Sequence, residues 1–200
     1  MPSTSRQPDK YRSFEQMRLE QKEGIDYEIE MADRHTSVVL IAPHGGHIEP
    51  RTTEITKAIA GDDYSYYSFS GLKPKRPHHE LHITSSNFDE PRGRGLAEAA
   101  KIVITIHGRG DRTDAKTIWL GGLDLPLKEK IASKLTAAGF GTLTSNHELE
   151  GTGQNNICNT GTSQAGVQFE LPRALRERLI EDGQLLNQFV QAVRDAISQA

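Results

Sequence analysis

Residues 37–54, SVVLIAPHGGHIEPRTTE, contain the pattern that decides the fold: a buried strand, a glycine turn and a helix. The run 38–42 is apolar and rich in β-branched residues, which is typical of a strand covered on both faces. Pro50 suits the first turn of a helix, where its missing N–H costs nothing. We therefore expect the strand to end after residue 42 and a turn to carry His44 and Glu49 toward the helix.

The side chains of this turn are suited to a catalytic zinc ion. Neutral imidazole and carboxylate are frequent ligands of such ions, and Gly45 and Gly46 allow the chain to fold His44 and Glu49 toward one point. His47 creates an H-x-x-H spacing and competes as a ligand candidate, although we expect it at the surface or behind the ligands. Taken alone, these residues also fit a plain glycine turn with exposed histidines.

Composition indicates one ordinary domain. The chain has 200 residues, 26% of them charged and 35% hydrophobic, with a net charge of −3, which argues against nonspecific nucleic-acid binding. It has no long apolar run and no signal-peptide core, so we expect a cytoplasmic monomer without membrane contact. Residues 1–10 predict a disordered tail and 11–200 a single domain. Cys158 is the only cysteine, and an inert side chain is favoured over a thiol nucleophile.

The remaining periodicity alternates strands with helices. Further strands are predicted at 27–31, 64–70, 102–106, 117–120, 141–144 and 167–171, with a short strand running into a turn over 81–91. Helices are predicted at 11–22, 52–60, 96–100, 127–138, 173–181 and 184–198. This order predicts an α/β domain whose open, mixed or mostly parallel central sheet is flanked by helices. The long polar segment 146–164 is typical of a functional or disordered loop.

Strand ends collect the side chains that a metal hydrolase needs. Ligands of α/β sheets bind beyond the carboxyl ends of the strands. His44 and Glu49 follow one buried strand, His107 follows another, and Glu170 lies at the end of the last. The sequence therefore predicts that these four groups meet at one edge of the sheet.

Five short motifs in order resemble the poly-γ-glutamate hydrolase family. They are APHGGHIEP, LHITSSNFDEP, TIHG, NNICN and VQFEL, and the resemblance covers roughly residues 25–199. Members are small zinc peptidases of phages and bacteria, with a fold related to zinc carboxypeptidases. The resemblance implies Zn(2+) held by His44, Glu49 and His107, and it implies that Glu170 acts as the general base in cleaving γ-glutamyl amide bonds.

One departure from the family concerns the substrate. Thr160 and Gly161 follow the NICN motif, where we expect an arginine. If that arginine holds a substrate carboxylate, the substrate of this chain differs from poly-γ-glutamate. A zinc deacylase or amidohydrolase acting on another small acyl-amide is therefore an alternative, as is a non-catalytic phage- or DNA-associated protein. The acidic balance favours an enzyme that acts on an acidic polymer or a small amide.

Several further side chains are candidates for substrate contact. Arg109 lies two residues after His107 and can stabilise an oxyanion or bind a carboxylate. His82 can hydrogen-bond substrate, orient a ligand or cap a strand end. The remaining candidates are Arg92, Arg94, Arg112, Asn156 and Asn159. For each arginine a solvated surface role is the alternative, and for the asparagines it is ordinary turn chemistry.

Overall fold

A seven-stranded mixed sheet forms the centre of the computed structural model, which describes residues 7–111 and 114–200. The strands are β1 (Tyr27–Ala32), β2 (Val38–Gly46), β3 (Ser65–Gly71), β4 (Ile102–Arg109), β5 (Ile118–Gly121), β6 (Thr142–Leu143) and β7 (Val167–Pro172), in the order β1-β3-β2-β4-β7-β5-β6. β3, β2, β4 and β7 run parallel, whereas β1 and β5 pair antiparallel with β3 and β7. The predicted α/β fold with a mixed, mostly parallel sheet is confirmed.

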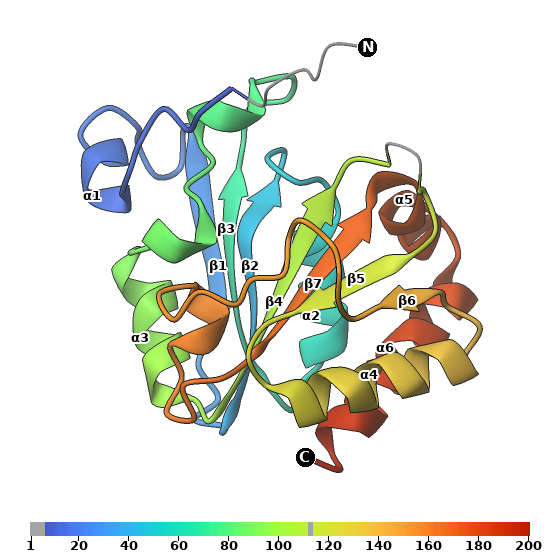
Figure 1. Ribbon diagram of the computed structural model, residues 1–200. Coiled ribbons are helices and arrows are strands. Elements are labelled where there is room, and N and C mark those ends of the chain that lie inside the picture. The colour runs from blue at the N-terminus through green and yellow to red at the C-terminus, as the bar shows by residue number, and fades with distance from the viewer. Residues whose placement is uncertain (1–6, 112–113) are drawn as a thin grey trace.

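Helices cover both faces of this sheet (Figure 1). They are α1 (Phe14–Met17), α2 (Thr52–Ala60), α3 (Pro91–Ala99), α4 (Leu125–Ala137), α5 (Arg173–Glu181) and α6 (Gly183–Ile197). α2, α4, α5 and α6 share one apolar core with Ile104 and Ile106, while α1 and α3 share the other with Val103. Because side chains alternate along a strand, Thr105 and His107 of β4 point to the α3 face.

β2 continues beyond the end that the sequence pattern predicts. It pairs with β4 only from Val38 to Ile41, and the register against β3 then shifts between Ala42 and Gly45. A proline at residue 43 cannot donate to a ladder, which suits this irregularity. Past it, β2 stays hydrogen-bonded to β3 and leaves β4, so the strand carries His44 toward the end of the sheet. The chain passes from β2 through α2 to β3 on one side, and then through α3 to β4 on the other side of β2, so the topological switch point lies between β2 and β4.

Of the short strand and turn predicted over 81–91, the strand is wrong, whereas the turn is present. This segment contains a 3-10 turn, Ser85–Asn87, and follows another, His78–Glu80. Leu81 and Ile83 alternate as in a strand, but they are buried in the core on the α3 side, and β1 already occupies the sheet edge beside β3. α3 begins at Pro91, earlier than expected, because Glu90 caps it by accepting a hydrogen bond from the Gly93 N–H at 2.9 Å.

The N-terminal region also differs from expectation. The helix predicted over 11–22 is a single turn, α1. Of the predicted tail, residues 1–6 lie outside the described residues, but the backbone N–H of Lys10 donates to the His79 carbonyl at 2.9 Å. The last residues of that tail are therefore held against the domain. Within the described ranges, no helix is long and apolar enough to cross a membrane.

Candidate metal centre and active site

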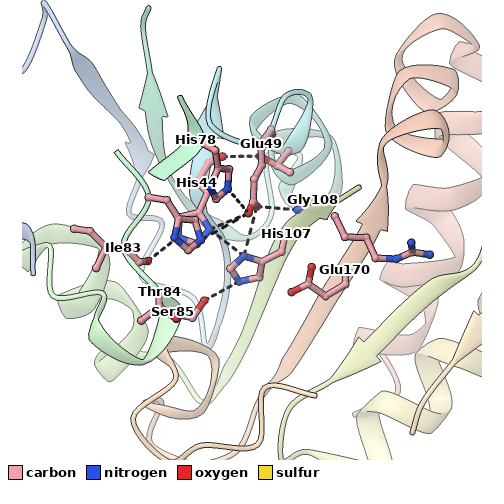
Figure 2. A network of polar contacts seen from close by, with 12 residues as sticks. His44, Glu49, His78, Ile83, Thr84, Ser85, His107, Gly108 and Glu170 are labelled. Carbon is pink, nitrogen blue, oxygen red and sulfur yellow. Dashed lines mark hydrogen bonds and ion pairs between the residues drawn. The ribbon is translucent and has the colours of Figure 1, made fainter. Parts of the chain in front are cut away.

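Glu49 lies at the centre of a buried cluster of histidines (Figure 2). Its Oε1 is 3.3 Å from Nδ1 of His44, and its Oε2 is 3.6 Å from Nδ1 of His107. The two Nδ1 atoms are 3.2 Å apart. All three side chains are almost fully buried. The end of β2, the turn after it and the end of β4 thus bring together the three residues that the sequence pattern predicted to meet.

Neighbouring backbone groups orient these side chains. Nε2 of His44 is 2.8 Å from the Ile83 carbonyl, and because a carbonyl only accepts, this nitrogen carries the hydrogen. In the neutral ring, the Nδ1 lone pair of His44 therefore faces Glu49. The Gly108 N–H donates to Oε2 of Glu49 at 2.8 Å, and Nε2 of His107 lies 3.2 Å from Oγ of Ser85. Hydrogen bonds of this kind behind a ligand are typical of metal sites.

The donor set fits a divalent cation. Zinc bonds to nitrogen and oxygen of about 2.0–2.1 Å place tetrahedral ligand atoms roughly 3.4 Å apart. The three contacts among His44, Glu49 and His107 span 3.2–3.6 Å. Imidazole nitrogens and carboxylate oxygens at this distance in a buried site repel unless a proton or a metal cation lies between them. Two imidazoles and a carboxylate suit zinc as well as other divalent transition-metal ions.

His82 belongs to the same cluster, which its sequence spacing did not suggest. One donor atom each from His44, Glu49 and His82 lie within 4.8 Å of one another. The rings of His82 and His44 have centroids 3.9 Å apart. Burial and the neighbouring His44 lower the pKa of His82 to about 3, so the ring is neutral. Nδ1 of His82 lies 2.7 Å from Oδ1 of Asp9, a carboxylate–histidine pair of the kind found behind metal ligands.

His78 is a further member that sequence reasoning missed. Its Nε2 lies 3.6 Å from Oε1 of Glu49, and its ring centroid is 4.4 Å from that of His82. The four-residue spacing of His78 and His82 was the available indication, since one helical turn places such residues on one face. Burial alone would raise the pKa of Glu49, but positive charge on a protonated His44 and hydrogen bonds from protonated nitrogens of His107, His44 and His78 would lower it well below the usual value.

Glu170 lies on β7 beside the metal-suited donors. It pairs in register with His107 across the parallel β4–β7 ladder, so both side chains leave the sheet on the same face. Figure 2 shows the Glu170 carboxylate next to the His107 ring. The side chain is buried, and its Oε1 accepts a hydrogen bond from Nε2 of Gln168 at 3.0 Å. This places a carboxylate next to the cluster, as the strand-end pattern predicted.

Arg109 holds the loop that follows β4. Its guanidinium donates to the carbonyls of Gly110, Asp114 and Thr117 at 3.1, 2.8 and 2.7 Å. It also lies 4.0 Å from the ring centroid of Trp119. These contacts account for the burial of Arg109, and its predicted oxyanion or carboxylate contact stays a prediction. Arg112 lies outside the described residues.

The other arginine candidates pair with carboxylates elsewhere. Arg92 and Arg94 lie on α3. Arg92 donates to Glu23 and Glu90, and Arg94 donates to Glu98. The structure therefore places these two arginines in surface ion pairs and does not bring them to the histidine cluster.

The two asparagine candidates are buried in the segment 146–164. Nδ2 of Asn156 donates to Oε1 of Gln168 at 2.8 Å. Nδ2 of Asn159 donates to the carbonyls of Gly151 and Gly153, both at 2.9 Å. Both side chains thus hold the loop together, which is the turn chemistry given as their alternative, and their substrate contacts stay predictions.

The sequence left alternative roles open for His47 and Cys158, and the two residues differ in exposure. His47 is exposed, in line with the expected surface position. Cys158 is fully buried, and burial raises the pKa of its thiol to about 12. The thiolate is the reactive form of cysteine, so Cys158 is not suited to act as a nucleophile.

Comparisons with known proteins agree with this geometry. Residues 11–196 match the sequence profile of the poly-gamma-glutamate hydrolase family. The SPbeta prophage-derived UPF0714 protein YoqZ of Bacillus subtilis (strain 168) is 36% identical over 180 residues, covering 89% of this chain; the match spans 64% of YoqZ. The solved structure of a bacteriophage poly-gamma-glutamate hydrolase superposes with a TM-score of 0.90 at 29% identity, covering 96% of this chain and 97% of that one.

A second similar structure is described as the zinc-free form of its protein. The zinc-free form of YndL superposes with a TM-score of 0.87 at 28% identity, covering 95% of this chain and 98% of that one. The family match covers nearly all of the domain that contains the Glu49 cluster. On this evidence, the chain belongs to the poly-gamma-glutamate hydrolase family.

Proposed function

We propose that this protein is a zinc-dependent hydrolase that cleaves γ-glutamyl amide bonds of poly-γ-glutamate or a similar acidic peptide. The observation that carries the proposal is the convergence of His44, Glu49 and His107 beside the buried carboxylate of Glu170. The family match supports the reaction class.

The residues divide the chemistry between them. His44, Glu49 and His107 would hold the metal, which when bound would act as a Lewis acid and lower the pKa of water toward neutrality. Glu170 accepts the proton of the attacking water and returns it to the leaving nitrogen. Its position on a paired strand restricts its movement, which a general base requires. His82 lies beside Glu49, with its Nε2 4.0 Å from Oε1, where it could contact either the metal or a substrate group.

A zinc deacylase acting on a neutral acyl-amide is the second candidate. It is favoured by the hydrogen bonds of the arginines that lie nearest to the motifs among the described residues, because these bonds already occupy their guanidinium groups. Arg109 binds loop carbonyls, while Arg92 and Arg94 bind carboxylates. A polyanionic substrate needs concentrated positive charge, and these three arginines are already engaged by groups of the protein itself.

Assay of the zinc-loaded protein separates these candidates. Poly-γ-glutamate and a neutral N-acyl amide would be compared at increasing ionic strength. Charge contacts are screened beyond roughly 10 Å at about 0.1 M salt, so KM for the polyanion should rise with salt while turnover at saturation changes less. Cleavage of the neutral amide alone, with a salt-independent KM, would support the deacylase.

A substitution tests the base itself. Glu170→Gln keeps the shape of the side chain and removes its basicity, so turnover should fall by about 100-fold or more while zinc stays bound. Glu98→Gln, on the exposed face of α3, is the matched control and should keep full turnover. Unchanged turnover in Glu170→Gln would assign the base elsewhere, with Glu148 and Glu150 next in line.

A further inference from the structure

Gln168 connects the proposed base, Glu170, to the long loop over residues 146–164. It precedes Glu170 by two residues on β7, so the two side chains share a face of the sheet. Its Nε2 donates to Oε1 of Glu170 at 3.0 Å and to the carbonyl of Leu149 at 3.3 Å. Its Oε1 accepts from Nδ2 of Asn156 at 2.8 Å. The side chain is buried, with a relative exposure of 5%.

These contacts permit a single orientation of the Gln168 amide. Both partners of Nε2 are oxygen acceptors, and the partner of Oε1 is an N–H donor. Turning the amide over would place its oxygen against the Glu170 carboxylate and the Leu149 carbonyl, leaving buried groups unpaired. The orientation of the amide is therefore fixed by its neighbours on both sides.

The loop packs closely over this amide. Gly151 adopts a φ of +60°, and a Cβ at that position would lie 2.8 Å from Oε1 of Gln168. Both the backbone conformation and the lack of space favour glycine there. The segment 146–164 is thus linked to Glu170 by two hydrogen bonds in series, from Asn156 to Gln168 and from Gln168 to the carboxylate.

We propose that Gln168 is a positioning residue for the general base: it holds one oxygen of Glu170 so that the carboxylate keeps the orientation needed for proton transfer. Asn156 completes the link by fixing the amide of Gln168. This inference rests on the proposed function, because it takes Glu170 as the base. A misplacement of about 1 Å at a reacting group can cost on the order of 100-fold in rate, so a hydrogen bond that restricts the carboxylate has a measurable effect.

Gln168→Met tests the proposal, since methionine has a similar length and cannot make the three hydrogen bonds. We expect kcat to fall by roughly 10- to 100-fold, with KM within about threefold and zinc content unchanged. Gln154→Met makes the same chemical change at an exposed position of the same loop and should leave kcat unchanged. An unaltered kcat in Gln168→Met would overturn the proposal.

A double-mutant cycle separates positioning from a merely structural role. If Gln168 acts through Glu170, adding Gln168→Met to Glu170→Gln should cause no further loss of turnover. An equal loss in both backgrounds would show that Gln168 supports the fold and not the base. Full turnover of Glu170→Gln would instead refute the assignment of the base, so the two failures are distinct.

Asn156→Ala provides a milder variant should Gln168→Met fail to fold. It leaves the contact between Gln168 and Glu170 in place and removes the donor to Oε1 of Gln168, together with the acceptor of the Cys158 N–H. A kcat reduced several-fold at unchanged KM and zinc content is expected. A raised KM at unchanged kcat would assign Asn156 to substrate binding and overturn the proposed link.

Discussion

Oδ1 of Asp9 lies 2.7 Å from Nδ1 of His82, across 73 positions of the sequence. The other carboxylate oxygen of Asp9 accepts from the Thr84 N–H at 2.9 Å. Burial would raise the pKa of Asp9, but the hydrogen bonds from His82 and from the Thr84 N–H lower it. The N-terminal segment therefore contributes an ionised group directly behind the histidine cluster.

Asp9→Ala should weaken zinc binding. Without the carboxylate, His82 loses the partner that orients its ring beside Glu49 and His44, and groups of this kind typically contribute about 10- to 100-fold in metal affinity. Competition with a chelator measures the effect. Lys10→Ala is the matched control, because Lys10 lies in the same segment but its side chain pairs with Glu20. Equal affinity in Asp9→Ala and wild type would remove Asp9 from the site.

His107→Ala should lose most of the bound zinc. The variant removes one of the three donors that lie 3.2–3.6 Å apart, leaving an incomplete set for a tetrahedral ion. Elemental analysis after gel filtration gives the zinc content of each variant. His35→Ala, at an exposed position, should retain the zinc content of the wild type. Full zinc in His107→Ala would leave His82 as the third ligand.

Arg109→Ala should destabilise the protein. The buried guanidinium makes hydrogen bonds to three carbonyls and contacts the Trp119 ring, so we expect a loss of about 2–3 kcal/mol. In a chain of this size that corresponds to a decrease in Tm of roughly 5–10 °C. Arg94→Ala, exposed on α3, should change Tm very little. An unchanged Tm with a raised KM for poly-γ-glutamate would instead assign Arg109 to substrate binding.

Asp26 should make the fold sensitive to acid. A hydrogen bond from Lys73, with others from the Lys22 N–H and Arg76, lowers the pKa of Asp26 to about 2. Because the pKa is lower in the folded state, the stabilisation is present above the unfolded pKa near 3.8 and is lost as the pH falls toward 2.

Denaturant unfolding of Asp26→Asn measures this contribution. At pH near 7 the variant should be less stable than wild type by about 1 kcal/mol, after allowing for the solvent exposure of Lys73. The difference should shrink steadily as the pH falls from about 4 to about 2. A difference that does not depend on pH would mean that packing, and not the charge of Asp26, determines the effect.

Local pattern was sufficient for the central strands and for four of the site residues. Runs such as 38–42 and 102–106 are apolar on both faces, so burial in a parallel sheet was the only stable outcome. The carboxyl ends of parallel strands lie at one edge of the sheet, which is why His44, Glu49, His107 and Glu170 could be expected to meet.

Tertiary structure alone decided the surroundings of those residues. Apolar and polar residues alternate at the start of segment 81–91 as they do in a strand. Because β1 occupies the edge of the sheet beside β3, the segment forms turns instead, and these bring His82 close to Glu49. Asp9 reaches His82, and Asn156 reaches Gln168, through contacts between segments distant in sequence. Periodicity reports only which face of an element is apolar. Which polar side chains become neighbours depends on how the elements pack, and that is determined by the whole chain.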